Sequence, residues 1–471
     1  MRMRPLKRSR TALTATAAAG LMATSAAFAV PAAASAASGA APGSEVTGTL
    51  ADGTTWVADL PQTWNGTLIL YSHGFGPLTA ADAPDPNTQA DLLADGYALA
   101  GSSYDPNGSE WALDTALSDQ FGTLAAVEST VLPRRPAHVI AFGTSMGGLV
   151  SALEAQDGAG KIDGALTTCG IVGGGVNLNE YQIDGEYALA QLLLPGQNTQ
   201  LVGFGGNDGA ALGTAATLTA AAATAQQTPA GRARLALAMA FLNVTPWDPS
   251  ATAPAPASDP AAQESAQYDT LFTGSFSILD FIELGRISFE QAEGGQDTWD
   301  VGTNFTEVLQ HSPFRHEVEA LYQAAGLSLN GDLADLTANT NITADPAALR
   351  NLIVTSDPTG RLAVPELDIH TIGDNLVPVQ NENYYRKQVD QAGSGDLLRQ
   401  AFTESYGHCN FSPAELVAGV QALMHRVTTG QWGNVATAAS LEQAATALNL
   451  GPARFVSYYP GNLTGAVPPL R

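Results

Sequence analysis

Residues 137–148 read A-H-V-I-A-F-G-T-S-M-G-G, and this stretch decides the fold. Its apolar run, 137–142, has the composition of a strand buried on both faces, which is typical of a parallel sheet covered by helices. The run ends at the pentad G-T-S-M-G centred on Ser145, and residues 149–156 then follow a helical pattern. A sharp turn between strand and helix needs small neighbours and pushes the serine hydroxyl forward. The pentad alone is weak evidence, since a glycine-rich turn also produces it, but this context predicts that Ser145 is a nucleophile.

Strands and helices alternate on both sides of this stretch. Apolar runs at 66–72, 96–102, 162–168 and 365–371 predict further buried strands, and residues 88–94, 114–130 and 380–392 predict helices between them. Two alternating segments, 46–50 and 54–60, flank Asp52-Gly53 and predict a hairpin. The expected fold class is therefore α/β, with a mostly parallel central sheet covered by helices.

The middle of the chain has a different character. Residues 185–362 contain Ala-, Thr- and Leu-rich helical patterns, near 187–194, 210–226, 232–242 and 314–325, and a Pro-, Ala- and Asp-rich linker at 246–260. They contain no convincing buried strand. We expect a catalytic core made of residues 45–184 and 363–471, interrupted by a mainly helical cap insertion at 185–362.

The N-terminus predicts export. Five basic residues within the first ten precede an apolar run to about residue 30, which is the pattern of a secretory signal. We place the signal at 1–36, with cleavage between 29 and 44, and expect a secreted, extracellular protein without membrane association after signal removal. The alternative is an anchor that is retained.

The net charge of the chain limits the classes of partner that it is expected to bind. The chain of 471 residues carries a formal net charge of −25, and the leader contains none of its 45 Asp and Glu residues. Such a field repels phosphate backbones and anionic lipid, so nucleic-acid binding is not expected, and a neutral substrate is favoured over a polyanion. Oligomeric state cannot be read from the sequence.

A serine nucleophile needs a histidine base and an acid that orients it. Asp374 follows the returning strand in G-D-N-L-V-P, and His408 follows the next strand candidate, 398–403, in Y-G-H-C-N-F. The order Ser145, Asp374, His408 is the order that this arrangement of strands imposes. Asp368 and Asp390 are alternatives for the acid, but the first lies within a strand and the second within a helix. His408 could instead be a solvent-facing loop residue.

An oxyanion hole requires two converging backbone N–H groups. Met146 should supply one, and the glycine-rich loop H-G-F-G, residues 73–76, should supply the other through Phe75 or Gly76. We expect His73 to order this loop rather than to transfer protons. No H-E-x-x-H motif or clustered metal-ligand spacing occurs, so neither a metal nor another cofactor is expected.

The motifs H-G-F-G, G-T-S-M-G-G, G-D-N-L-V-P and G-H-C-N-F, in this order, resemble those of the α/β-hydrolase superfamily. They span most of the chain after the leader except the insertion, which lies where members of the superfamily carry a lid or cap. The resemblance implies the fold and a Ser-His-Asp triad but not the substrate, because the superfamily includes esterases, lipases, peptidases and polyester depolymerases.

The two cysteines lie beside these motifs. Cys169 closes the strand next to the nucleophile strand, and Cys409 follows His408 directly. We hypothesise that they form a disulfide, which would be similar to the active-site disulfide of tannases and feruloyl esterases. An even number of cysteines in an exported chain favours this pairing. Those enzymes carry a cysteine before the nucleophile, where this chain has Thr144, so their substrates are not carried over. Two buried free thiols remain the alternative.

The favoured function is a serine esterase that acts through an acyl-enzyme on a neutral or apolar ester, either a small molecule or a polymer such as a polyester. A serine peptidase or aminopeptidase of the same fold is the second hypothesis. A non-catalytic binding protein is the third, and a complete set of triad residues argues against it.

Overall fold

A nine-stranded sheet organises the part of the chain that the computed structural model describes, residues 43–274 and 276–468. Its strand order is β1-β2-β4-β3-β5-β6-β7-β8-β9, and the six strands from β4 to β8 are parallel. The pairs β1-β2, β2-β4 and β8-β9 are antiparallel. The strands are β1 (Glu45–Thr49), β2 (Thr55–Asp59), β3 (Thr67–Ser72), β4 (Ala98–Ser102), β5 (His138–Thr144), β6 (Gly164–Thr168), β7 (Glu366–Gly373), β8 (Leu398–Tyr406) and β9 (Phe455–Val456).

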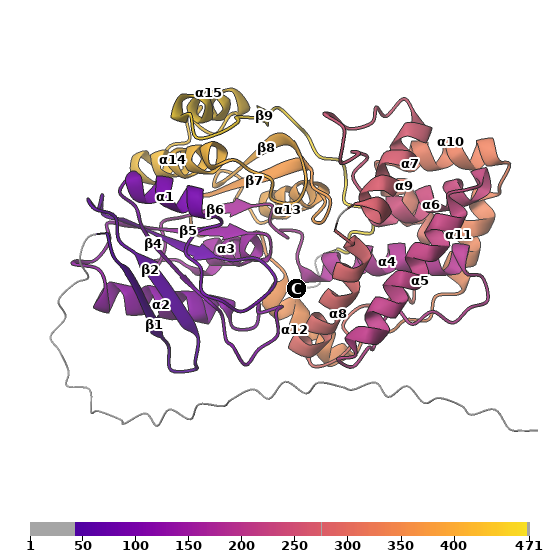
Figure 1. Ribbon diagram of the computed structural model, residues 1–471, viewed down its shortest axis with the longest axis horizontal. Helices are drawn as coiled ribbons and strands as arrows, with labels where there is room; N and C mark the ends of the chain where they lie inside the picture. The colour runs from indigo at the N-terminus through magenta and orange to yellow at the C-terminus, as the bar shows by residue number, and fades with distance from the viewer. Residues whose placement is uncertain (1–42, 275, 469–471) are drawn as a thin grey trace, which may run out of the picture. The chain divides into compact units, whose positions relative to one another are not determined.

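Helices cover both faces of the sheet, because its parallel strands are apolar on both sides. Leu68 and Leu70 of β3 belong to one core cluster, whereas Ile69 between them belongs to another. The first cluster is closed by α2 (Ala116–Thr130), α3 (Met146–Asp157) and α13 (Gln380–Gln391). The second is closed by α1 (Pro86–Ala94), α14 (Pro413–Thr429) and α15 (Ala438–Leu448). Figure 1 shows these layers.

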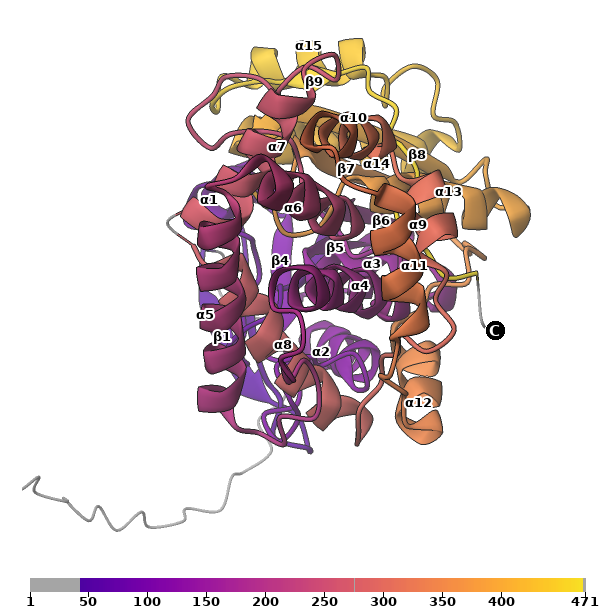
Figure 2. The same ribbon diagram turned by 90° about the vertical axis from the view of Figure 1, so that its right-hand side faces the viewer.

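The helices expected in the middle of the chain lie between β6 and β7. They are α4 (Gly175–Leu193), α5 (Asp208–Ala225), α6 (Pro229–Phe241), α7 (Pro260–Tyr268), α8 (Ile278–Glu293), α9 (Phe305–His311), α10 (Arg315–Ala325), α11 (Leu329–Ala338) and α12 (Pro346–Ser356). These helices share an apolar core of their own, in which α4 packs against α6 and α6 against α10. Figure 2 views this helical part face on.

The expected elements agree with this architecture, with two differences. The helix expected at 187–194 begins at Gly175, so the proposed boundary at residue 184 falls inside α4. Helices α7, α8, α9, α11 and α12 and strand β9 were not expected. The described residues belong to one compact unit, so the division into core and cap stays a prediction. The predicted signal, 1–36, lies outside the described residues.

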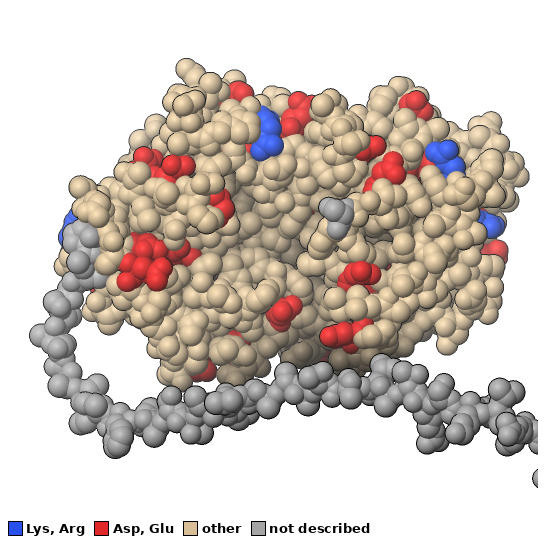
Figure 3. All heavy atoms as spheres, in the orientation of Figure 1, with Lys and Arg blue, Asp and Glu red and all other residues tan. Residues whose placement is uncertain are grey.

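Two further observations bear on location and partners. No helix within 43–274 or 276–468 has both the length and the apolar composition to cross a bilayer. On the face drawn in Figure 3, acidic side chains are scattered over the surface and basic ones are few, as the net charge of −25 requires.

Candidate active site

The turn between β5 and α3 holds Ser145 in a strained conformation. Its backbone angles, φ of 60° and ψ of −121°, lie in a region that residues other than glycine rarely adopt. The turn is possible because its neighbours lack side chains: a Cβ on Gly143 would lie 1.8 Å from the carbonyl oxygen of Gly147, and a Cβ on Gly147 would lie 1.9 Å from that of Ser72. Ser145 stands directly before the first residue of α3, so the N-terminal dipole of that helix faces the hydroxyl region.

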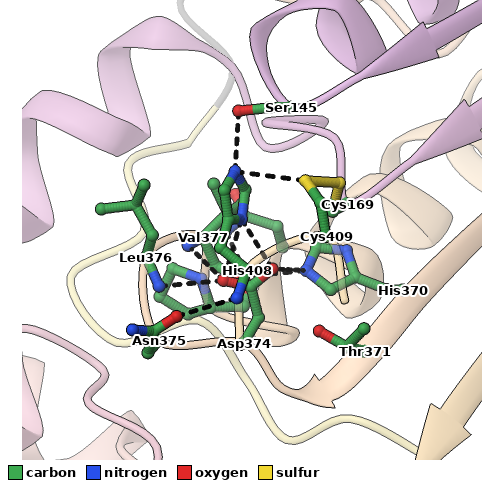
Figure 4. A network of polar contacts seen from close by, with 12 residues as sticks. Ser145, Cys169, His370, Thr371, Asp374, Asn375, Leu376, Val377, His408 and Cys409 are labelled. Carbon is green, nitrogen blue, oxygen red and sulfur yellow. Dashed lines mark hydrogen bonds and ion pairs between the residues drawn. A yellow bond between two sulfur atoms is a disulfide. The ribbon is translucent and has the colours of Figure 1, made fainter. Parts of the chain in front are cut away.

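The structure brings His408 and Asp374 to this serine. The Oγ atom of Ser145 lies 2.8 Å from Nε2 of His408, and Nδ1 of His408 lies 2.8 Å from Oδ2 of Asp374 (Figure 4). A carboxylate only accepts hydrogen bonds, so Nδ1 carries the proton and Nε2 is free to accept the serine proton. His408 follows β8 and Asp374 follows β7, so parallel neighbours deliver both to one edge of the sheet.

Backbone amides fix the carboxylate of Asp374. Its Oδ1 accepts hydrogen bonds from the N–H groups of Leu376, at 2.9 Å, and Val377, at 2.8 Å. Burial alone would raise the pKa of Asp374, but the charge of His408 and hydrogen bonds from His370 and His408 hold it well below its usual range. The side-chain oxygen of Asn375 accepts the backbone N–H of His408 at 2.8 Å, which ties the two loops together. Asp368 and Asp390, the alternative acids, lie within β7 and α13 and do not contact His408.

Cys169 and Cys409 form a disulfide, which confirms the predicted pairing and excludes two free thiols. Cys169 stands at the end of β6, and its backbone N–H donates to the carbonyl of Ile369 in β7. Cys409 follows His408, with one sulfur 3.3 Å from Nε2 of that histidine. Both cysteines have positive φ, 44° and 53°, so the bond joins two tight turns beside the base.

The two cysteines and the neighbouring histidine are also potential metal ligands. Potential ligand atoms of Cys169, His408 and Cys409 lie within 4.8 Å of one another. Both sulfurs are already joined to each other, so no thiolate is left to bind an ion.

The loop at residues 73–76 approaches the nucleophile closely. A Cβ added to Gly74 would lie 3.2 Å from the Cβ of Ser145, so a larger residue would crowd the serine. Within the described residues, the backbone hydrogen bonds include none donated by the N–H groups of Phe75 or Gly76. His73 binds the carbonyl of Gly74 through Nδ1 at 2.8 Å and packs on the ring of Tyr104, in agreement with a role in ordering this loop.

An apolar pocket opens beside Ser145. Its walls come from the core and from helices of the insertion, and they are formed by Phe75, Trp111, Ile171, Leu178, Gln182, Phe281, Ile282, Gly285, Phe289, Leu376 and Val377. Four of these residues are aromatic and form two pairs. The ring centroids of Phe75 and Phe281 lie 5.4 Å apart in an edge-to-face arrangement, and those of Trp111 and Phe289 lie 3.9 Å apart in a stack. Gln182 of α4 is a polar side chain on the wall of this pocket.

None of these pocket residues was expected from the sequence, apart from Phe75. A signal was present in α8, where Ile282, Gly285 and Phe289 are spaced three and four apart and so share a helix face. Trp111 and Gln182 had no comparable signal, because their places depend on contacts between distant parts of the chain. The sequence also gave no reason to single out His370, which lies behind Asp374.

The chain is similar to several known proteins. No family model matches the chain. The chain is 30% identical to an o-phthalyl amidase from Xanthobacter agilis over 444 residues, which cover 88% of this chain and 94% of that protein. Solved structures that the chain resembles include feruloyl esterase B from Aspergillus oryzae, with a TM-score of 0.43 and 13% identity over 82% of this chain and 80% of that one. An esterase from Aspergillus oryzae has a TM-score of 0.40 and 14% identity over 81% and 78% of the two chains.

Proposed function

The chain belongs to the α/β-hydrolase superfamily, in one family with the o-phthalyl amidase of Xanthobacter agilis, and from this premise we propose that it hydrolyses carboxylic esters through an acyl-enzyme on Ser145. One observation carries the proposal. The atoms Ser145 Oγ, His408 Nε2, His408 Nδ1 and Asp374 Oδ2 form a continuous chain, with both gaps between residues at 2.8 Å. This is the geometry that a serine needs to lose its proton as it attacks a carbonyl.

The proposed reaction has two halves. In the first, Oγ of Ser145 bonds to the substrate carbonyl carbon while its proton passes to Nε2 of His408. The bond to the leaving group then breaks, and that group takes the proton from His408. In the second half, water replaces Ser145 by the same steps, which releases the acid and restores the serine.

The negative oxygen of both tetrahedral intermediates needs donors that are already in place. We assign this role to the backbone N–H of Met146, at the start of α3, and to that of Phe75 or Gly76. The closeness of the loop to Ser145 at Gly74 supports this assignment, because it keeps both groups of donors beside the nucleophile.

We assign an aromatic acyl group to the pocket beside Ser145, since four aromatic rings line it. Gln182 adds one requirement. A substrate group that pairs with its carboxamide gains a hydrogen bond that an unsubstituted ring cannot form. We therefore expect the preferred acyl group to carry a hydroxyl, carbonyl or carboxyl substituent within reach of Gln182.

Amide hydrolysis is the second candidate, and the 30% identity to an o-phthalyl amidase favours it. The same triad serves both bonds, because His408 can give its proton to an oxygen or to a nitrogen leaving group. A serine peptidase is a special case of this candidate.

The deciding experiment compares matched esters and amides. Aryl p-nitrophenyl esters and the corresponding p-nitroanilides are assayed with the wild-type protein and with Ser145→Ala. We expect ester turnover in the wild type and a loss of roughly 10⁴-fold or more in the variant. Amide turnover without ester turnover would reverse the ranking of the two candidates, and full activity in Ser145→Ala would exclude the mechanism.

The role of Gln182 is tested by Gln182→Leu. We expect kcat/KM for a benzoyl ester with an ortho hydroxyl or carboxyl group to fall by about 10- to 100-fold, while the unsubstituted benzoyl ester changes little. Leu178→Met, one turn away on the same pocket wall, serves as the control and should affect both esters equally. An equal effect of Gln182→Leu on both esters would contradict the assignment.

We also propose that the protein is exported. The basic and apolar pattern of residues 1–36 supports this, and the disulfide between Cys169 and Cys409 is the kind of bond that persists in oxidising compartments.

A further inference from the structure

A second histidine lies behind Asp374, on the side away from Ser145. His370 is in β7 and is completely buried. Its Nε2 lies 3.5 Å from Oδ2 of Asp374, the same oxygen that binds His408, and 3.0 Å from the carbonyl oxygen of Val377. Figure 4 shows His370 and His408 on either side of this carboxylate.

The partners of His370 fix where its protons are. Both groups near Nε2 can only accept hydrogen bonds, so Nε2 carries a proton. Nδ1 lies 2.8 Å from Oε1 of Glu382 in α13, and Oε2 of Glu382 accepts a hydrogen bond from Gln400 at 2.6 Å. Burial alone would lower the pKa of His370, but hydrogen bonds to Asp374 and Glu382 and the charges of these residues raise it to about 10. His370 is therefore an imidazolium at neutral pH.

Several other titratable groups lie near His370 and Asp374. They are Asp368 and Glu366 on β7, Glu382 on α13, Asp374 after β7 and His408 after β8. Burial raises the pKa of Asp368 well above its usual value and that of Glu366 to about 8, so burial disfavours a negative charge on both. The charged groups next to Asp374 are thus the imidazolium of His370 and, beyond it, Glu382.

We propose that His370 is a positioning residue of the hydrolytic reaction, a buried cation that keeps the Asp374 carboxylate ionised and directed toward His408. The inference rests on the proposed function, because it assigns His370 a role through Asp374 and His408. Oδ1 of Asp374 is held by two backbone amides, whereas the described residues offer Oδ2 only His408 and His370. Without His370, Oδ2 depends on His408 alone.

The charge has a second effect. A positive charge on the far side of Asp374 opposes any further positive charge beside that carboxylate. We therefore expect the acid limb of the kcat/KM profile to lie at lower pH in the wild type than in a variant that lacks the charge of His370.

Two variants separate the charge from the ring. His370→Gln keeps a donor near the position of Nε2 but has no charge, and Glu382→Gln keeps the imidazole but removes the carboxylate that stabilises its second proton. We expect kcat to fall about tenfold in His370→Gln with KM within twofold, and the acid limb of the kcat/KM profile to move up by about one pH unit in both variants. His138→Gln is the control, since His138 lies at the opposite end of β5 from Ser145, 3.8 Å from Asp163.

A measurement on the wild-type protein avoids dependence on folding of the variants. Nitrogen-15 NMR of the seven histidines distinguishes imidazolium from neutral rings, and we expect one ring to keep both protons above pH 8. Unchanged acid limbs in folded His370→Gln and Glu382→Gln, or seven neutral rings at pH 8, would overturn the inference. Neither result would touch the proposed function, which is tested separately by the ester and amide assays of the wild type and Ser145→Ala.

Discussion

Asp374 is the residue on which the electrostatics of the site converge. It is fully buried, yet its carboxylate is ionised, because two backbone amides and two histidines surround it. A buried carboxylate with this many donors has little freedom to rotate. We therefore expect it to hold one tautomer and one orientation of His408 rather than to exchange protons itself.

Replacement of Asp374 tests this role directly. Asp374→Asn should lower kcat by about 10³-fold or more, because an amide can donate to Nδ1 and stabilise the wrong tautomer of His408. Asp390→Asn, in α13, is the control and should keep wild-type kcat in the same ester assay. Near-normal activity in Asp374→Asn, or a large loss in Asp390→Asn, would mean that the acid has been assigned to the wrong residue.

The buried titratable groups also predict how stability depends on pH. The contribution of Asp374 is fully present above its ordinary pKa, near 4, and is lost only as pH falls through its depressed value. His370 has the opposite sign: its contribution is complete below 6.5 and is lost as pH rises toward 10. Burial raises the pKa of Glu154 and Glu366 to about 8, so these carboxyls also favour unfolding as pH rises.

We therefore expect the melting temperature to fall between about pH 7 and pH 10. Thermal unfolding followed by circular dichroism at a series of pH values measures this fall in the wild type and in His370→Gln. The variant should show a shallower fall, because it lacks the proton that His370 releases. Parallel curves for the two proteins would show that His370 is not charged in the folded state.

At the scale of elements, α8 forms one wall of the pocket beside Ser145. It contributes Phe281, Ile282, Gly285 and Phe289 to the pocket. Its next residue after Gly285 is Arg286, which is buried and forms an ion pair with Glu186 of α4. Because α4 starts shortly after β6, this pair fixes the position of α8 relative to the end of the sheet that carries the nucleophile.

Loss of one partner in this pair should be costly. Arg286→Met leaves Glu186 buried without its cation, and the loss of one partner of a buried ion pair destabilises proteins by about 3–5 kcal/mol. The double variant Arg286→Met, Glu186→Leu should recover most of this free energy of unfolding in chemical denaturation. Arg315→Ala, which removes an exposed pair with Glu319, is the control and should cost under about 1 kcal/mol. If Arg286→Met also lowered the free energy of unfolding by less than about 1 kcal/mol, the ion pair would not hold α8 in place.

The elements differ in how far the sequence predicts them. Strands such as β3, β5 and β6 were predicted because they are apolar on both faces. Helix α8 was not, since a buried arginine among acidic residues resembles a solvated face. Ser145, Asp374 and His408 could be predicted because strand order fixes their positions. Gln182 and His370 could not, because the contacts that define them lie across the fold.

At the scale of the whole molecule, the disulfide joins the end of β6 to the loop after β8 across 240 positions. Reduction should lower kcat, because the loop that carries His408 gains freedom, and should lower the melting temperature, because a long loop is no longer closed. Assays and melting curves in a titration with dithiothreitol measure both effects. The Cys169→Ala, Cys409→Ala variant should match the reduced protein and should not respond to the reductant. Equal activity in oxidised and reduced wild type would show that the bond does not support His408.

The long insertion also determines when activity can arise during synthesis. Thr167 of β6 donates a hydrogen bond to Glu366 of the adjacent β7, 199 positions later. The ribosome therefore completes the turn that carries Ser145, and then every helix of the insertion, before β7 can pair with β6. Asp374 and His408 emerge after that, and bringing them to Ser145 requires closure of this long loop. The nascent chain carries Ser145 without the proposed base until the segment with His408 has been made, so we expect the hydrolase to remain inactive through most of its own synthesis.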